Sequence, residues 1–403
     1  MTEPLFASAL STEADFGQAF SSAATELEAQ LGGRAPDLAL AFVSHHHGPA
    51  MERLGSELAL RTRAKHVLAC TGESIVGGTR EIESGAGLAL FAGVLPKTVL
   101  RPFRVGVVQS DETTFGFSGG PDVRDPARAS ILLFADPYAF PAREYLELQN
   151  ERLPGVPVIG GMASGGSGPG QNFLWDADGL VEEGAVGIVI EGAIEVASIV
   201  SQGCRPVGHP YVITGCKENL IHKLGGKPAV QALLETLETL TPDDRQLLQS
   251  RPFLGLALDA RKQSFERGDF LVRGLIGIEP KSSALAVGDD AIRPGMTVQF
   301  LVRDAATASE DLVSLTRQRA GQHAGSPSSM GALLFSCNGR GSRMFASADH
   351  DIGCVQTGLA GAGAVAEPVP AAGFFAAGEI GPIGGRNFLH GFTASVALFR
   401  ARG

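Results

Sequence analysis

The residues best suited to chemistry follow one apolar run near the C-terminus. Residues 332–336 predict a buried strand. The loop that follows carries a thiol, an amide, a guanidinium and two glycines: Cys337, Asn338, Gly339, Arg340 and Gly341. Because α/β sheets present polar groups at the carboxyl ends of their strands, and glycine allows a ligand to approach the backbone closely, this loop is a predicted small-molecule site. The alternative is a tight turn whose polar side chains face water.

An amino-acid ligand needs a cation for its carboxylate and an anion for its ammonium group. Arg340 or Arg386 can supply a forked pair of charge-assisted hydrogen bonds. Glu379, or Asp349 with Asp351, can supply the anion. The alternative is that Arg340 and Glu379 pair with each other and only hold the loops. The ligand residues predicted beyond the Cys337 loop are Glu379, Arg386 and Asn387.

Cys337 also invites a catalytic interpretation. It would be a nucleophile, with His350 as its base and Asp349 or Asp351 orienting that base. A neighbouring Arg340 can stabilise a thiolate and make the thiol reactive without making it catalytic. The sequence contains no signature of a cysteine hydrolase, so no catalytic residue is assigned, and a role other than catalysis is favoured.

Metal and cofactor sites are weakly indicated. In the run of residues 45–47, three consecutive histidines point in alternating directions, which favours a solvated cluster over a metal site. Haem would need one axial histidine in an apolar pocket, for which His350 and His390 are candidates, although C-x-x-C-H is absent from the sequence. We therefore predict neither a metal nor a cofactor and keep haem as an alternative.

These residues must be positioned by alternating strands and helices. Periodicity predicts one long amphipathic helix over residues 11–31 and further helices over 49–63, 141–152, 229–240 and 308–320. Buried strands are predicted at 38–44, 66–71, 87–95, 131–135, 156–160, 185–191, 333–336, 373–376 and 393–399. Gly-rich stretches over 72–78, 161–170 and 378–385 are predicted to be loops.

Two stretches echo each other: Gln-Asn-Phe-Leu over 171–174 and Arg-Asn-Phe-Leu over 386–389. Each follows a Gly/Pro loop and precedes a strand, which indicates an internal duplication. The first of these loops is a second predicted ligand region, containing Ser164, Gly165, Gly166 and Asn172. Gly225-Gly-Lys-Pro228 predicts a domain boundary near 222–228.

Composition narrows the class of protein. A chain of 403 residues with 44% hydrophobic residues predicts two globular domains. The net charge of −10, without a cluster of Lys and Arg, disfavours nucleic acid as a partner. Five cysteines without C-x-x-C spacing suggest reduced thiols and a cytoplasmic location. Neither a signal peptide nor a membrane-spanning run is evident, so we expect no membrane insertion.

The combination of motifs resembles the FIST family, in which an N-terminal half precedes a C-terminal half. The resemblance is carried by the loop 163–166, the junction 221–229, Cys337-Asn-Gly-Arg340, Gly378-Glu379 and Asn387…Thr393. It implies an N-terminal helix over 1–34, a FIST N-like domain over 35–224 and a FIST C-like domain over 225–403. It also implies a sensory protein that binds a small polar metabolite, such as an amino acid, and signals to a separate protein.

Other members of the family imply alternatives. In some, the module follows an F-box and serves as a protein-interaction adaptor, and in others it binds haem and senses nitric oxide. The fold class expected is α/β with mixed sheets, in two domains that each contain a duplicated αββα-type layered sandwich. Binding is expected at the Gly-rich loops of the C-terminal domain or between domains.

Overall fold

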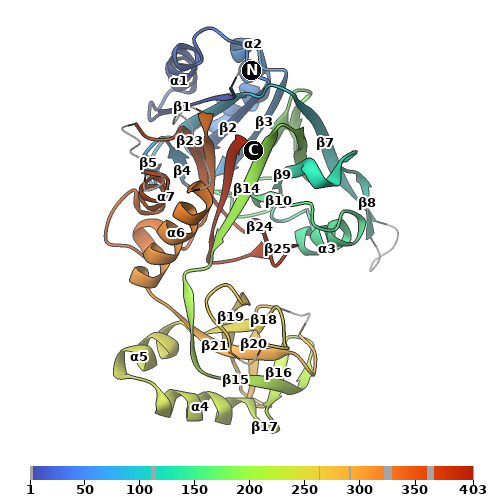
Figure 1. Ribbon diagram of the computed structural model, residues 1–403, viewed down its shortest axis with the longest axis vertical. Helices are drawn as coiled ribbons and strands as arrows, with labels where there is room; N and C mark the ends of the chain where they lie inside the picture. The colour runs from blue at the N-terminus through green and yellow to red at the C-terminus, as the bar shows by residue number, and fades with distance from the viewer. Residues whose placement is uncertain are drawn as a thin grey trace. The chain divides into compact units, whose positions relative to one another are not determined.

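The structure is a computed structural model that describes residues 3–109, 115–262, 264–289, 292–321, 329–360 and 367–402. The chain divides into two compact units, a larger one from Met1–Val200 with Leu312–Gly403 and a smaller one from Ser201–Asp311. Both contain helices and strands, so the predicted mixed α/β class is confirmed (Figure 1).

The larger unit repeats one pattern three times: a strand, a helix, a parallel strand, a short hairpin and an antiparallel strand. The first repeat comprises β2 (Leu38–Ser44), α2 (Leu54–Thr62), β3 (His66–Gly72), β4 (Ile75–Gly77), β5 (Arg80–Ile82) and β6 (Leu88–Val94). The second comprises β9 (Ala129–Ala135), α3 (Ala142–Arg152), β10 (Val158–Met162), β11 (Leu174–Asp176), β12 (Gly179–Val181) and β13 (Ala185–Gly192). The third comprises β22 (Gly331–Cys337), α7 (His350–Ala360), β23 (Ala371–Ala376), β24 (Glu379–Ile383), β25 (Arg386–His390) and β26 (Ala394–Ala401).

Each repeat lends its hairpin to the sheet of another repeat. The three sheets have the orders β1-β6-β2-β3-β11-β12, β25-β24-β10-β9-β13-β7-β8 and β14-β26-β22-β23-β4-β5. The hairpin β4–β5 thus joins the third repeat, β11–β12 joins the first and β24–β25 joins the second. This cyclic exchange relates the three repeats by an approximate threefold arrangement.

The strand that precedes each repeat is not exchanged. These strands are β1 (Leu5–Ser11), β7 (Thr98–Gln109) and β14 (Ile194–Ser201), and each lies beside the last strand of the repeat that follows it: β6, β13 and β26 respectively. Other elements of this unit are α1 (Phe16–Leu31), η1 (His45–Arg53), β8 (Phe115–Gly119), η2 (Pro126–Arg128) and η4 (Gly341–Arg343).

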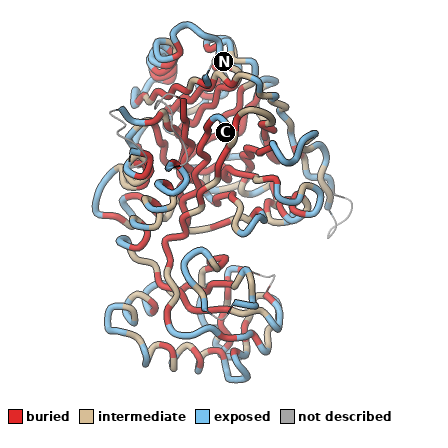
Figure 2. Tube along the Cα trace, viewed as in Figure 1, coloured by how far each residue is buried: buried red, intermediate tan, exposed pale blue. Residues whose placement is uncertain are grey.

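The three sheets share one core. Phe42, Phe134 and Phe335 occupy equivalent positions on β2, β9 and β22, and their ring centroids lie 5.6, 5.9 and 6.4 Å apart. Helices cover the opposite face of each sheet: α1 and α2 on the first, α3 on the second, and α7 with residues 312–320 of α6 (Ala305–Ala320) on the third. Figure 2 shows the strands of this unit as its buried centre. Three sheets around a common core thus replace the face-to-face pair expected from sequence.

The smaller unit is an antiparallel sheet with the order β15-β21-β18-β19-β20-β16-β17. An additional pairing of β15 with β16 closes this sheet on itself. Its elements are β15 (Cys204–Lys217), β16 (Leu220–Leu224), β17 (Lys227–Pro228), α4 (Ala229–Thr239), α5 (Pro242–Ser250), β18 (Phe253–Ala257), β19 (Phe270–Glu279), β20 (Ala284–Val287) and β21 (Thr297–Arg303). Gly225 and Gly226 form the turn between β16 and β17 inside this unit.

The Gly-rich stretches predicted as loops contain the exchanged hairpins. Residues 72–78 include β4, and residues 378–385 include β24, so these two loop predictions were wrong. The strands are short and pair with a distant repeat, which no local pattern reveals. The echo between 171–174 and 386–389 also misleads, because Asn172 precedes the first strand of its hairpin whereas Asn387 lies on the second strand of its own. The repetition is real but threefold, and its register differs from that echo.

Candidate functional site

The Cys337 loop lies at the carboxyl end of β22, as predicted. The amide N–H of Arg340 donates to the carbonyl of Cys337 (2.8 Å), which closes the turn. Gly341 has φ +58°, and a Cβ atom there would lie 2.6–2.8 Å from the Glu83 carboxylate. Only glycine fits this position, and the tight turn sends the Arg340 side chain into the interior.

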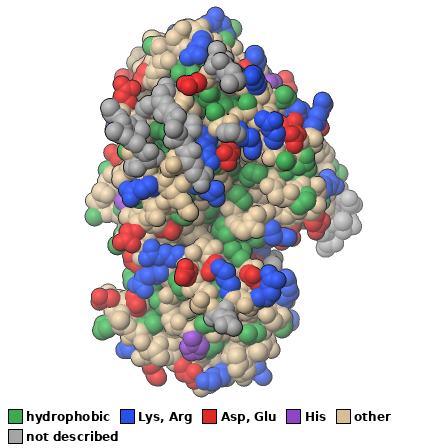
Figure 3. Space-filling model, viewed as in Figure 1, with side chains coloured by type: hydrophobic (Ala, Val, Ile, Leu, Met, Phe, Trp, Pro, Cys, Tyr) green, Lys and Arg blue, Asp and Glu red, His purple; other side chains and the backbone are tan. Residues whose placement is uncertain are grey.

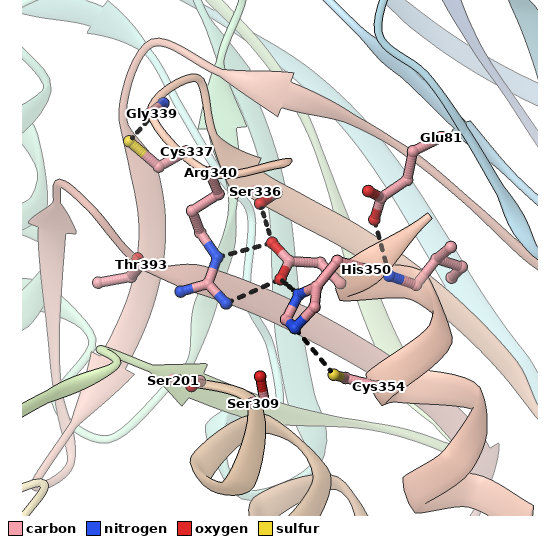
Figure 4. A network of polar contacts seen from close by, with 12 residues as sticks. Glu81, Ser201, Ser309, Ser336, Cys337, Gly339, Arg340, His350, Cys354 and Thr393 are labelled. Atoms are coloured by element: carbon pink, nitrogen blue, oxygen red, sulfur yellow. Dashed lines mark hydrogen bonds and ion pairs between the residues drawn. The ribbon is translucent and has the colours of Figure 1, made fainter. Parts of the chain in front are cut away.

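Arg340 is completely buried and forms an ion pair with the equally buried Asp351. Its Nε and Nη2 donate to the two carboxylate oxygens at 2.6 and 2.8 Å. The hydroxyl of Ser336 and the Nδ1 of His350 lie 2.5 and 2.9 Å from the same carboxylate (Figure 4). Burial alone would raise the pKa of Asp351, but Arg340 and these hydrogen bonds hold it well below its usual range. The remaining nitrogen of Arg340, Nη1, has no hydrogen-bond partner among the described residues.

Glu379 is a second fully buried carboxylate in the same cluster. Its Oε2 accepts hydrogen bonds from the amide (3.0 Å) and the hydroxyl (2.7 Å) of Thr393, whereas its Oε1 has no partner among the described residues. Burial raises the pKa of Glu379 to about 7, against the opposing effects of Thr393, the Arg340 charge and a hydrogen bond with Cys337. The Cys337 thiol, the Arg340 guanidinium and the Glu379 carboxyl group therefore interact with one another. The described ion pair of Arg340, however, is with Asp351.

The pairing of a carboxyl group with a threonine at this contact is specific to the third repeat. In each repeat, the backbone amide at the end of the first strand donates a hydrogen bond to the carbonyl of the residue before the last strand. The pairs are Ser44 to Gly87, Asp136 to Gly184 and Cys337 to Thr393, at 2.9, 2.9 and 3.0 Å. The first residue of the exchanged hairpin is Ile75 in the first repeat, Leu174 in the second and Glu379 in the third. These residues pair with Phe374, Cys70 and Gly161 of the neighbouring strands. The third repeat thus has Thr in place of Gly and Glu in place of Ile or Leu.

The first repeat shows the same geometry without the polar atoms. A Cβ atom added to Gly87 would lie 3.0 Å from the Cβ of Ile75. In the third repeat the equivalent residues, Thr393 and Glu379, are joined by two hydrogen bonds. The fold therefore accepts glycine and isoleucine at this contact, so Thr393 and Glu379 are not required for its packing.

The other residues predicted near this loop have varied surroundings. Asn338 has a buried Oδ1 without a partner among the described residues, and its backbone bonds to Ala376 and Arg343. Arg386 is exposed on β25. The Asn387 side chain is buried, accepts from the amide of Val158 (2.8 Å) and donates to the carbonyl of Val156 (2.9 Å). Asn387 therefore joins β25 to the second repeat.

The second predicted loop meets the third repeat through Ser164. Its hydroxyl accepts from the amide of Glu73 (2.8 Å) and donates to the carbonyl of Phe375. Asn172 Oδ1 accepts from the amide of Gly166 (3.0 Å), and Gly165 adopts φ +97° against the His45 ring. Buried Asn172 Nδ2 has no partner among the described residues. Ser164 thus ties together the ends of β3, β10 and β23.

The imidazole of His350 is fixed from both sides. Nδ1 faces Asp351, Nε2 lies 3.8 Å from the Sγ of Cys354, and the ring stacks on Phe345 with centroids 3.3 Å apart. The His–Asp pair suspected from sequence is therefore present, but the thiol recorded beside it is that of Cys354. Burial raises the pKa of Cys354 to about 11, which disfavours its thiolate. The other haem candidate, His390, has Nε2 2.9 Å from the carbonyl of Gly381.

Three acidic residues of the first repeat bind the segment after Arg340, two at the loop and one at the first turn of α7. Glu73 pairs with Arg343, Glu83 accepts from the amide and hydroxyl of Ser342, and Glu81 accepts from the amide of Ile352 (2.7 Å). Burial, with the nearby Asp351 charge, raises the pKa of Glu81 to about 8. Sequence reasoning missed these residues, because they belong to a hairpin exchanged from another repeat.

Within the described ranges, no cluster of three or more His, Cys, Asp or Glu residues is arranged to hold a metal ion. No helix in the described part of the chain is long and apolar enough to cross a membrane. On the face seen in Figure 3, Lys and Arg side chains are interspersed with Asp and Glu.

Comparisons with known proteins cover almost the whole chain. The FIST N domain model matches residues 37–227, and the FIST C domain model matches residues 229–382. The uncharacterized protein Mb0898c of Mycobacterium bovis is 40% identical over 391 residues, which is 96% of this chain and 97% of that protein. The uncharacterized protein Rv0628c of Mycobacterium tuberculosis is 37% identical over 394 residues, covering 97% and 98% of the two chains.

Proposed function

Because this chain belongs to the FIST family, whose members join a FIST N domain to a FIST C domain, we propose that it senses an α-amino acid or a closely similar polar metabolite. FIST domains are generally sensor domains of signal transduction. The ligand would bind among Cys337, Arg340 and Glu379, and a separate signalling protein would receive the signal.

The observation that carries this proposal is a pair of buried polar atoms of opposite character. Arg340 Nη1 is a cationic donor and Glu379 Oε1 is a carboxyl oxygen, and neither has a hydrogen-bond partner among the described residues. A buried polar group left unpaired costs about 1–3 kcal/mol, and more when it is charged. A carboxylate on Nη1 and an ammonium group on Oε1 would satisfy both atoms at once, and an amino acid carries both groups.

The remaining contacts fix these two atoms in place. Asp351 holds the other two nitrogens of Arg340, and Thr393 holds the other oxygen of Glu379. Each partner thereby leaves one atom of its charged group available. Such preorganisation lowers the cost of binding, because the charged side chains need not be reordered by the ligand.

A thermal-shift screen of the wild-type protein with the common amino acids, and with nucleotides as a comparison class, tests the proposal. A ligand present at a hundredfold its dissociation constant adds about 2.7 kcal/mol to the free energy of unfolding. We expect at least one amino acid to raise Tm, and the same amino acid without its carboxylate or its ammonium group to have no effect. If no amino acid raises Tm at millimolar concentration, the proposal is wrong.

A further inference from the structure

We propose that Cys337 is a nucleophilic thiol that is alkylated selectively by small electrophiles carrying a carboxylate. The inference concerns the site of the proposed function and shares its use of Arg340, but it does not require an amino acid to bind. It adds a chemical activity, covalent capture, to the recognition proposed above.

Three groups around the Cys337 sulfur favour its reaction. The Glu379 carboxyl group is hydrogen-bonded with Cys337 and can take the thiol proton. The amide N–H of Gly339 donates to Sγ (3.5 Å), and the Arg340 guanidinium interacts with the thiol electrostatically. A proton acceptor together with a donor and a positive charge is the arrangement that stabilises a thiolate.

Burial disfavours the thiolate at three of the other cysteines. Cys70 is completely buried, and burial raises its pKa well above the usual value. Cys216 and Cys354 are partly exposed like Cys337, but burial raises the pKa of both thiols. Cys216, where burial is the only cause of the raised pKa, therefore serves as the internal control of similar exposure. Cys354 is no such control, because the Arg340 charge also acts on it and His350 Nε2 lies 3.8 Å from its sulfur.

The preference for a carboxylate follows from Arg340 Nη1. This nitrogen is fully buried, has no hydrogen-bond partner among the described residues and belongs to a guanidinium that already interacts with the thiol. A carboxylate bound there would hold an electrophilic carbon attached to it near Sγ. Proximity of this kind accelerates a bimolecular reaction, because part of its entropy cost is met by binding.

The reaction balances without an oxidant. With iodoacetate, the thiol proton passes to the Glu379 carboxylate, an S–C bond forms, the C–I bond breaks and iodide leaves. Glu379 then returns the proton to solvent. The product is a carboxymethyl thioether on Cys337. This substitution requires no external oxidant or reductant.

The test compares alkylation rates by iodoacetate and by the neutral iodoacetamide at pH 7, measured by peptide mass spectrometry on the native wild-type protein. We expect iodoacetate to modify Cys337 at least fivefold faster than iodoacetamide does, with the opposite order at Cys216, where an anionic reagent is repelled by the thiolate. An equal or reversed order at Cys337, or no modification there, would overturn the proposal.

Two further measurements keep the test independent of protein stability and of the proposed function. Unreactive acetate should slow iodoacetate at Cys337 without slowing it at Cys216; acetate that slows neither overturns carboxylate steering. Glu379→Gln should slow both reagents at Cys337, and an unchanged rate would overturn the role of Glu379 as proton acceptor. If Cys337 prefers iodoacetate but the protein binds no amino acid, only the sensor proposal is refuted. If the protein binds an amino acid but Cys337 shows no preference for iodoacetate, only the proposal of selective alkylation is refuted.

Discussion

The third repeat of the larger unit differs from the first two in what it buries. All three present the same strand end, the same backbone bond to it and the same exchanged hairpin. At the meeting point of these elements the first repeat has Gly87 and Ile75, and the second has Gly184 and Leu174. The third has Thr393 and Glu379. Since the first two repeats place glycine and an aliphatic residue at this contact, Thr393 and Glu379 are not needed to form it. Local departures from stability rules are expected at functional sites, and the proposed ligand site accounts for this one.

Removing the partner of Arg340 tests this contrast most severely. In Asp351→Ala the guanidinium remains buried without its counter-charge, so we expect the free energy of unfolding to fall by about 3–5 kcal/mol. Chemical denaturation measures the change. The matched control is Asp259→Ala, which removes a carboxylate from the exposed pair with Arg261 and should leave the denaturation midpoint unchanged. Equal stability of wild-type and Asp351→Ala would show that the pair is not buried as described.

Replacing Glu379 by leucine, the residue at the equivalent position of the second repeat, should increase the stability of the protein. Burial raises the pKa of Glu379 to about 7, so between its ordinary value near 4.5 and about 7 the folded protein binds more protons than the unfolded chain. The wild-type protein therefore loses stability as pH rises through this window. Glu379→Leu should be more stable than wild type by about 3 kcal/mol at pH 8 and show no such advantage at pH 4.

Denaturation of both proteins at the two pH values measures this difference. Glu81, whose pKa is also raised, is present in both proteins, so its titration cancels in the comparison. The same variant should no longer respond to an amino acid in the thermal-shift assay. A stability difference that stays constant from pH 4 to pH 8 would contradict the account of Glu379.

A smaller change removes one hydrogen bond. Thr393→Val keeps the backbone donor to Glu379 Oε2 but loses the hydroxyl donor, so we expect a loss of about 1 kcal/mol. Denaturation at pH 8 measures it, with Thr25→Val as the control, because the Thr25 hydroxyl makes only exposed hydrogen bonds, to the carbonyl of Ser21 and from Arg61. A loss at Thr393 no larger than that at Thr25 would indicate that this hydroxyl does not hold the carboxylate.

The smallest effect is expected at the other candidate cation. Arg386 is exposed on β25, so Arg386→Ala should change the free energy of unfolding by less than about 0.5 kcal/mol. It should also leave the response to amino acids intact in the thermal-shift assay. A lost response would transfer the role of carboxylate ligand from Arg340 to Arg386.

Strands, helices and the central loop were predictable because their signals are local. The strand over 38–44 and the end of the first helix at Leu31 were placed correctly by apolar periodicity, and the Cys337 loop by the residues that follow a buried strand. The start of that helix was wrong, because it begins at Phe16 and neither at residue 11 nor at residue 1. The β1 strand was missed, since Leu5–Ser11 mixes apolar and small residues and pairs with β6, far along the chain.

The candidate site was predictable only in part. Cys337, Arg340 and Glu379 were selected by residue type, but Asp351 as the partner of Arg340 and Thr393 as the partner of Glu379 depend on how separate elements pack. Arg386 and Asn387 lie next to each other in sequence on the same strand, yet one is exposed and the other buried. Successive side chains of β25 point to opposite faces of the sheet, which makes Arg386 exposed and Asn387 buried. The sequence alone does not show which repeat β25 joins, so it does not show which face is buried.

The central claim is that Arg340 Nη1 and Glu379 Oε1 bind one ligand between them. A crystal structure of the protein grown with the amino acid that raises Tm most tests it directly. We predict electron density for one molecule with its carboxylate on Nη1 and its ammonium group on Oε1, each within hydrogen-bond distance. Density for water alone, or side chains packed together without space for a ligand, would contradict the account.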